Sequence, residues 1–202
     1  MTQPSLKRRM ERMKKKSIQM GKAMKASSKK RALKWKYVIL VIVAVSIIGL
    51  DQLTKIAIVE RFHLGETVSV LLNFFNITYV QNKGAAFGLL AQADPRFRVP
   101  FFIVVPLVAL GSIAFVFKKI PDHNIKLSVA LSLVISGAVG NLIDRLTLGY
   151  VVDFLDFHWR WSYHFPAFNV ADSAICVGVG ILMLDLLMND GGTPGYKKGD
   201  TA

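Results

Sequence analysis

Four long apolar stretches, separated by polar segments, dominate the pattern of hydrophobic and polar positions along the chain. They lie at about residues 37–59, 99–117, 127–148 and 170–188. A helix needs about 20 residues to cross the hydrocarbon core of a bilayer, and each stretch is close to that length. The pattern therefore predicts an all-α membrane protein with four transmembrane helices.

The segment between the first two predicted helices, about residues 60–98, is longer than a simple connection needs. It contains the run NFFNITYVQN, which is rich in aromatic and β-branched residues and partly alternates, followed by GAAFG. Such residues in partial alternation are typical of strands. We therefore predict a small extended (β) element in this loop.

The formal net charge of +13 comes from one segment of the sequence. Residues 1–36 contain 14 of the 26 Lys and Arg residues but a single acidic residue, Glu11, and the rest of the chain is balanced. We predict that residues 1–36 are a disordered cytoplasmic tail attracted to anionic membrane lipids, by about 1 kcal/mol per basic residue near the surface. No fold or aromatic motif indicates nucleic acid as a partner. Residues 37–188 then form the membrane domain, and residues 189–202 a second cytoplasmic tail.

The basic residues of the connecting segments orient the predicted helices, because short cytoplasmic loops are enriched in Lys and Arg. The tail 1–36 and the connection 118–126, which has three lysines, are basic, whereas the loops 60–98 and 149–169 have few basic residues. We therefore predict that both termini lie in the cytoplasm and that the two longer loops lie on the outer face of the membrane.

Polar and charged side chains in or beside the apolar stretches are costly in a bilayer and usually functional. Most of them are expected at the outer ends of the helices: Asp51, Lys55, Asn141, Asp144, Arg145, Asp153, Asn169 and Asp172. Because the first and third helices run outward and the fourth runs inward, these residues reach one depth near the outer interface. Asp185 falls toward the cytoplasmic end instead, and is expected to be solvated there.

Small residues recur every four positions along the third apolar stretch, at Ser128, Ser132, Ser136 and Gly140. Small residues at this spacing let helices pack closely in lipid. The next step of this small-residue stripe is Asp144. We therefore expect Asp144 to point into the helical bundle.

Carboxylates gathered at an apolar boundary are suited to acid–base hydrolysis. Two close carboxyl groups share one proton, so the ionised member can take a proton from water while the protonated member polarises a peptide carbonyl. The single cysteine, Cys176, is expected to be buried in helix packing, and the sequence has no HExxH zinc motif and no G-x-S-x-G elbow. The pattern thus indicates an aspartyl hydrolase that needs no metal and no cofactor. Spacing alone leaves Asp144, Asp153 and Asp172 open as members of the pair.

Two other functions fit parts of the pattern. A small ion-coupled transporter also uses intramembrane carboxylates, but these would be distributed across the bilayer rather than gathered at one depth. A non-catalytic scaffold would use the basic tail to recruit anionic lipid or nucleic acid. Activity after deletion of residues 1–34 would separate this scaffold from an enzyme.

Five ordered motifs resemble those of the lipoprotein signal peptidases, or signal peptidase II, of bacteria. They are DQLTK at 51–55, QNKGAAFG at 81–88, GNLIDR at 140–145, VVDF at 151–154 and FNVADS at 168–173. Each motif alone is weak, but five in this order, at the expected membrane depth, form a strong signal. The resemblance covers about residues 37–188.

The resemblance implies a role for each residue that matches a motif position. Asp153 and Asp172 would be the catalytic pair, with Asp144 in support. The residues that hold the substrate backbone or orient the pair would be Asn82, Asn141, Arg145 and Asn169. The structural residues would be Asp51, Lys55 and Gly84.

The resemblance also implies a substrate, namely a prolipoprotein whose lipobox cysteine already carries diacylglycerol. The enzyme would remove the signal peptide by cutting on the amino side of that cysteine. It would act as a monomer in the bacterial cytoplasmic (inner) membrane, with its active site at the outer face. A lipid-anchored cysteine holds its scissile bond near the membrane surface, at the depth where the carboxylates gather.

Overall fold

The computed structural model describes residues 10–20, 34–84, 90, 92–159 and 163–189. The chain divides into two compact units, Met1–Lys34 and Trp35–Ala202. In the first unit, residues 10–20 are helical and fully exposed. All further elements belong to the second unit.

The second unit is built on helices that are long and apolar enough to cross a membrane, four of them in the described part of the chain. They are α2 (Trp35–Arg61), α3 (Pro95–Lys119), α4 (Ile125–Thr147) and α5 (Val170–Asn189). Each begins and ends within four residues of a predicted apolar stretch. The predicted fold class, a helical membrane protein with four spanning helices and a small β element, is confirmed.

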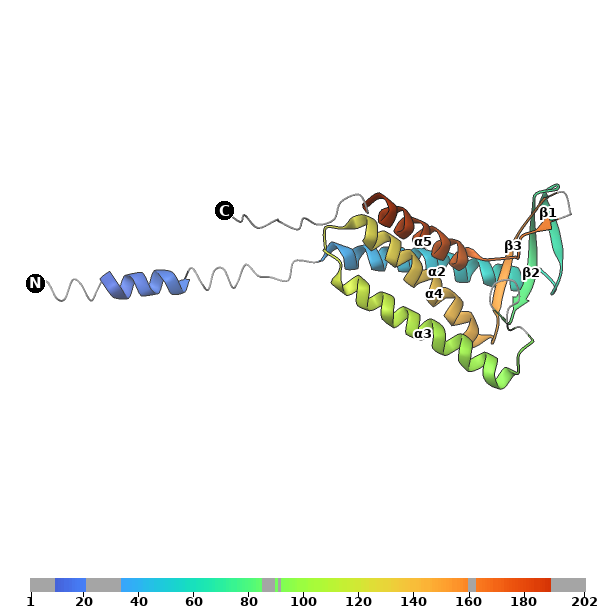
Figure 1. The fold of residues 1–202 in the computed structure, drawn as a ribbon, viewed down its shortest axis with the longest axis horizontal. Helices are drawn as coiled ribbons and strands as arrows, with labels where there is room; N and C mark the ends of the chain where they lie inside the picture. The colour runs from blue at the N-terminus through green and yellow to red at the C-terminus, as the bar shows by residue number, and fades with distance from the viewer. Residues whose placement is uncertain (1–9, 21–33, 85–89, 91, 160–162, 190–202) are drawn as a thin grey trace, which may run out of the picture. The chain divides into compact units, whose positions relative to one another are not determined.

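Helix α4 is the centre of the bundle and packs against α2, α3 and α5 (Figure 1). The small-residue stripe makes this possible, since Ser128, Ser132 and Ser136 are completely buried. Each serine hydroxyl donates to the carbonyl four residues earlier, at 2.6–2.7 Å. The hydroxyls are therefore satisfied within the helix, and neighbouring helices can approach closely.

The ends of α2 and α3 are joined by reciprocal capping. The buried ammonium of Lys36 donates to the carbonyls of Phe117, Lys118 and Ile120 at 2.8–3.2 Å, where α3 ends. The carboxylate of Asp122 accepts the backbone N–H groups of Trp35 and Lys36, where α2 begins. These contacts satisfy backbone groups that a helix end leaves open, with the charge signs that helix dipoles favour.

Asp185 also lies at this end of the bundle, where the sequence analysis expected it to be solvated. Its side chain is 17% exposed and pairs with Lys126, with an oxygen–nitrogen distance of 3.2 Å. The carboxylate is thus partly exposed, and it has a partner that the sequence did not indicate, because α4 begins beside the end of α5 and brings a lysine to it.

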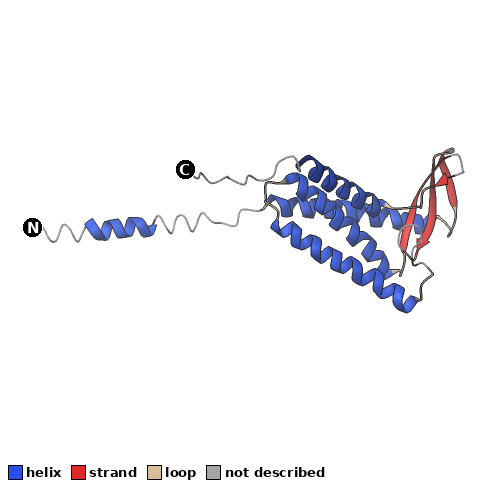
Figure 2. Cartoon of the chain, viewed as in Figure 1, coloured by secondary structure: helices blue, strands red, loops and turns tan. Residues whose placement is uncertain are grey.

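The strands lie at the opposite end of the bundle, which we call the sheet end (Figure 2). They are β1 (Thr67–Leu71), β2 (Phe75–Asn82), β3 (Val151–Trp159) and β4 (Tyr163–His164), in antiparallel order β1-β2-β3-β4. The sequence pattern predicted an extended element only in the first long loop, whereas β3 comes from the second and was not predicted. Strand β3 is buried along most of its length, so it lacks the alternation that marks a half-buried strand.

A small apolar core fixes the sheet to the bundle. It combines Ile58 of α2 with Tyr79 of β2 and with Val152 and Phe154 of β3, all buried. The register pairs Val80 of β2 with Asp153 of β3. Because successive side chains of a strand point to opposite faces, burial of Val152 and Phe154 against the bundle turns Asp153 to the other face.

Candidate active site

Asp153 is the third residue of β3 and is 2% exposed. Its carboxylate accepts two amide hydrogen bonds, one from Nδ2 of Asn82 at 3.0 Å and one from Nδ2 of Asn169 at 2.7 Å. Asn82 is the last residue of the adjacent strand β2. Strand pairing and the start of α5 together fix the direction of this carboxylate.

Asp172 is the third residue of α5, and the local sequence fixes its direction. Its backbone N–H donates to Oδ1 of Asn169 at 2.9 Å, and its Oδ2 accepts the backbone N–H of Asn169 at 3.2 Å. This reciprocal pattern is a capping box, in which the residue before a helix and its third residue satisfy each other's N–H groups. The other carboxylate oxygen, Oδ1, accepts from Nδ2 of Asn141 at 2.7 Å.

Asn169 joins the two carboxylates and is completely buried. Its Nδ2 donates to Asp153, and also contacts Oδ1 of Asn141 at 3.1 Å. Its Oδ1 and backbone N–H hold Asp172. One residue therefore sets the position of both aspartates, which come from different elements of the fold.

The motif that follows β2 is attached to α4 through Arg145. The guanidinium donates to the carbonyl of Gly84 at 3.0 Å and lies over the ring of Phe102, 4.4 Å from its centre. The backbone N–H of Gly84 donates to Oδ1 of Asn82 at 3.0 Å. Gly84 thus orients the amide that contacts Asp153. The last residues of this motif, 85–88, lie outside the described residues.

The electrostatics of the site favour one retained proton. Burial and the nearby charge of Asp172 raise the pKa of Asp153 to about 7, against the opposing effects of the Asn82 and Asn169 hydrogen bonds and of Lys55. The pKa of Asp153 therefore lies near neutral pH, so that the pair can hold a proton and a negative charge together.

A cavity of about 980 Å³ opens beside the pair, and both aspartates line it. Its wall includes Arg145 and the apolar side chains of Phe168 and Ile175. Cys176 also lines it and is exposed, so the expected burial of this cysteine in helix packing is wrong. The cavity is large enough for a peptide segment with an apolar group.

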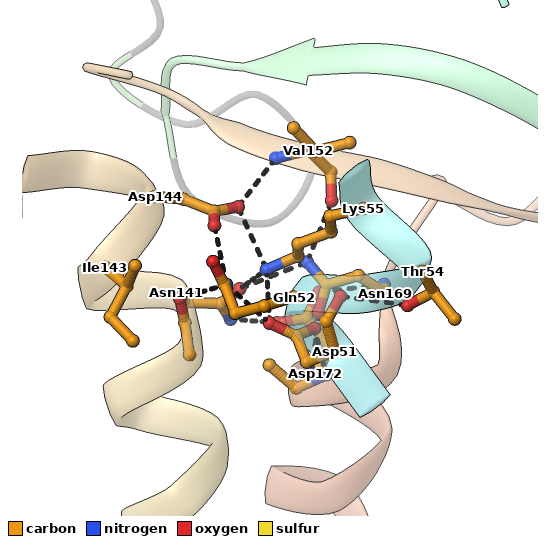
Figure 3. A network of polar contacts seen from close by, with 12 residues as sticks. Asp51, Gln52, Thr54, Lys55, Asn141, Ile143, Asp144, Val152, Asn169 and Asp172 are labelled. Atoms are coloured by element: carbon orange, nitrogen blue, oxygen red, sulfur yellow. Dashed lines mark hydrogen bonds and ion pairs between the residues drawn. The ribbon is translucent and has the colours of Figure 1, made fainter. Parts of the chain in front are cut away.

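Next to Asp172 lies a buried ionic cluster, which we call the Lys55 cluster: Asp51, Gln52, Lys55 and Asp144 (Figure 3). The ammonium of Lys55 is 2.8 Å from Asp51 and 2.9 Å from Asp144. Asp51 and Lys55 were expected to be structural and Asp144 to point inward, as found. Gln52 was not predicted, and its Nε2 donates to Oδ1 of Asp144 at 2.9 Å and to Oδ2 of Asp51 at 3.1 Å. The signal in the sequence that could have identified Gln52 was its amide side chain next to Asp51, at the depth of the carboxylates.

The site therefore brings together all the residues singled out from the motifs, in two layers. One layer is the Asp153–Asp172 pair with its asparagines and Arg145, and the other is the Lys55 cluster. Among the described residues, no group of three or more His, Cys, Asp or Glu side chains could hold a metal ion. The arrangement can supply a proton, accept a proton and bind a peptide beside an apolar wall.

Comparison with known proteins identifies the family. The sequence model described as Signal peptidase (SPase) II matches residues 43–188. The lipoprotein signal peptidase of Geobacter metallireducens is 51% identical over 150 residues, which cover 74% of this chain and 90% of the relative. That of Syntrophotalea carbinolica is 52% identical over 146 residues, covering 72% and 89%. A bacterial membrane enzyme structure determined by the in meso method at 2.3 Å resolution superposes with a TM-score of 0.68 at 34% identity, over 81% of this chain and 94% of that one.

The spanning helices, the site beside them and these relatives agree with one another. They describe a multi-pass bacterial membrane protein that is a peptidase, and this chain belongs to the signal peptidase II family.

Proposed function

We propose that this chain is an aspartyl endopeptidase that removes signal peptides from prolipoproteins, with Asp153 and Asp172 as its catalytic pair. The observation that carries the proposal is the single buried residue, Asn169, that donates to both carboxylates at the wall of the cavity, to Asp153 from its side chain and to Asp172 from its backbone N–H. The raised pKa of Asp153, about 7, supports a pair that keeps one proton at neutral pH. Asp144, the third candidate, binds the ammonium of Lys55 instead.

In the proposed reaction, the ionised carboxylate of the pair takes a proton from water, and the water oxygen attacks the scissile carbonyl carbon. The protonated carboxylate donates a hydrogen bond to the carbonyl oxygen, on which negative charge develops. The C–N bond then breaks, and a proton from the pair goes to the leaving amine. One water is consumed, and the products are a new carboxyl end and a new amino end.

The asparagines have distinct proposed tasks in this reaction. Asn82 and Asn169 donate to Asp153, and Asn141 donates to Asp172. Both carboxylates line the cavity, and a carboxylate that accepts two hydrogen bonds can still accept others from water or substrate. Arg145 lines the cavity while its guanidinium holds Gly84, so it can also contact the substrate backbone.

The proposed substrate is a prolipoprotein that already carries diacylglycerol on its lipobox cysteine, cut on the amino side of that cysteine. The pair lies at the sheet end of the bundle, beside the ends of spanning helices. A lipid-anchored cysteine presents its scissile bond at this depth. The basic residues of the short connection at the opposite end support a cytoplasmic location for that end and an outer location for the site.

An ion-coupled carrier would need carboxylates along a path across the bilayer. Among the described residues of the spanning segments, the buried aspartates Asp51 and Asp144 lie beside the pair at the sheet end. Asp185, at the other end, pairs with Lys126. This distribution favours the peptidase.

The test uses purified protein in detergent, a diacylglyceryl-modified prolipoprotein and mass spectrometry of the product ends. Asp153→Asn and Asp172→Asn should each abolish cleavage while the protein still folds, and Asp185→Asn should retain it. Excess EDTA should leave cleavage unchanged, since the reaction uses two carboxyl groups and water. Near-normal activity of either Asp153→Asn or Asp172→Asn would refute the assignment, and a product that does not begin at the lipidated cysteine would refute the cut site.

A further inference from the structure

The Lys55 cluster reaches the backbone immediately before each aspartate of the pair. Oδ1 of Asp51 accepts the backbone N–H of Ala171 at 2.9 Å. Oδ2 of Asp144 accepts the backbone N–H of Val152 at 3.1 Å. Ala171 directly precedes Asp172, and Val152 directly precedes Asp153.

Lys55 is the link between these two anchors. Its ammonium contacts Oδ2 of Asp51 at 2.8 Å and Oδ2 of Asp144 at 2.9 Å, and its side chain is 4% exposed. The path from Ala171 to Val152 therefore runs through Asp51, Lys55 and Asp144. It connects the start of α5 to β3 through side chains of α2 and α4, in addition to the direct bonds of Phe168 and Asn169 to β3.

Lys55 also orients an amide that binds the pair. Its ammonium donates to Oδ1 of Asn141 at 3.1 Å, and Nδ2 of Asn169 donates to the same oxygen at 3.1 Å. Two donors at one position require the amide oxygen there. Nδ2 of Asn141 is then forced to face Asp172, to which it donates at 2.7 Å.

We propose that Lys55 is a second positioning residue of the catalytic pair, which acts beside Asn169 by holding the backbone before each aspartate through Asp51 and Asp144 and by balancing the negative charge of the pair. The proposal rests on the proposed function of the pair. It makes the Lys55 cluster part of the catalytic apparatus rather than a general stabiliser of helix packing.

The charge balance follows from the carboxylates that interact with the ammonium. Asp51 comes from its own helix, Asp144 from α4, Asp153 from β3 and Asp172 from α5, and Arg145 of α4 is a second positive charge near the last three. Lys55 opposes the rise in the pKa of Asp153 that burial and Asp172 cause. Removing its charge should therefore let Asp153 hold its proton to higher pH.

Lys55→Met tests this proposal, because it keeps the length of the side chain and removes its charge. The kcat for the lipid-modified substrate should fall about 10- to 100-fold, in line with the effect of small misplacements of reacting groups, while KM changes by less than about threefold. Both limbs of the pH profile of kcat should move to higher pH. Lys55→Arg keeps the charge, so its pH profile should stay close to that of the wild type.

Asp144→Asn gives an independent readout with the opposite sign. The asparagine oxygen can still accept the N–H of Val152, but it leaves the charge of Lys55 less compensated. The pH profile should then move to lower pH. If Lys55→Met does not fold, the comparison of Asp144→Asn with Lys55→Arg decides the question.

Lys36→Met is the matched control, since Lys36 is 3% exposed, lies on the same helix and donates to three carbonyls at the opposite end of the bundle. It should lower the thermal stability without moving the pH profile. The proposal is overturned if Lys55→Met behaves like Lys36→Met, or if Asp144→Asn moves the profile in the same direction as Lys55→Met. Failure of the proposed function is separate, because the wild type would then not cleave, or Asp153→Asn would remain active.

Discussion

Asn169 offers the sharpest test of how the pair is held, because its two tasks can be separated by substitution. As the residue before α5 it accepts the N–H of Asp172 at 2.9 Å, and as a donor it contacts Asp153 at 2.7 Å. Serine is as good a capping residue as asparagine, but alanine is not. Asn169→Ser therefore keeps the cap and loses the donor, whereas Asn169→Ala loses both.

The magnitudes follow from the two kinds of contact. A hydrogen bond to a charged group contributes about 1.5–3 kcal/mol, and each 1.36 kcal/mol is a factor of ten in rate. Both variants of Asn169 should thus lose about 10- to 150-fold in kcat. Loss of the cap costs about 1 kcal/mol of stability, so the alanine variant should be less stable than the serine variant by that amount.

The substitution also has a defined effect on pH dependence. The bond from Asn169 lowers the pKa of Asp153, against burial and the charge of Asp172, which raise it to about 7. Without that bond the pKa rises further. The alkaline limb of the kcat profile should therefore move to higher pH in both variants.

The assay measures kcat, KM and thermal unfolding of each purified variant in the same detergent, from pH 5 to 9. Asn124→Ala is the matched control, because Asn124 caps α4 at the opposite end of the bundle by accepting the N–H of Leu127 at 3.0 Å. It should lose stability but not kcat. If Asn169→Ser keeps the wild-type kcat while Asn169→Ala loses it, the donor to Asp153 is unimportant and the reasoning fails.

Three further outcomes are expected. Wild-type kcat should fall above about pH 7 as Asp153 loses its proton, and a flat kcat profile to pH 9 would contradict this. The contribution of Asp153 to the free energy of unfolding should also decrease as pH rises from about 4 to 7, because the folded state binds the proton more tightly than the unfolded state. Gly137→Ala should lower stability by about 1–3 kcal/mol, since its Cβ would collide with the carbonyl oxygen of Ala171. Gly111→Ala is the control and should not destabilise the protein, because open space surrounds Gly111. Equal thermal unfolding of the two variants would disprove the close packing of α4 and α5. Deleting residues 1–34 should leave kcat/KM within about twofold, because every site residue belongs to the unit Trp35–Ala202; a larger loss would assign the tail a part in catalysis.

Helices and strands differ in how far their hydrogen-bond partners lie along the chain, and this difference explains which elements could be predicted from the sequence. A helix satisfies its backbone hydrogen bonds internally, so length and hydropathy suffice to locate one in a membrane. The apolar stretches predicted on that basis agree with α2 to α5 to within four residues at each end. Strand β3 is different, because it exists only where β2 pairs with it, and residue 82 meets residue 151 in that register. Its buried, unalternating sequence carries no local sign of the pairing.

The candidate site also has features that the sequence predicts and features that it does not. The depth of the polar residues, and the inward direction of Asp144, could be predicted from the positions of helices and from a four-residue spacing. Which carboxylate meets Asp172 could not, since Asp144 and Asp153 are near in sequence and both lie at the sheet end. Spacing left them equivalent, and the family resemblance supplied the choice of Asp153.

By itself, then, the sequence determined four membrane-spanning helices, a cluster of polar groups at one end of them, and the motifs of the signal peptidase II family. Only the tertiary structure decided that Asp144 turns to Lys55, that Asp153 lines the cavity with Asp172, and that Asn169 binds both. The physical reason is the range of the interactions. Burial in a bilayer is a property of a local segment, whereas the contact between Asp51 and Ala171 joins residues 120 positions apart and depends on the path of the whole chain.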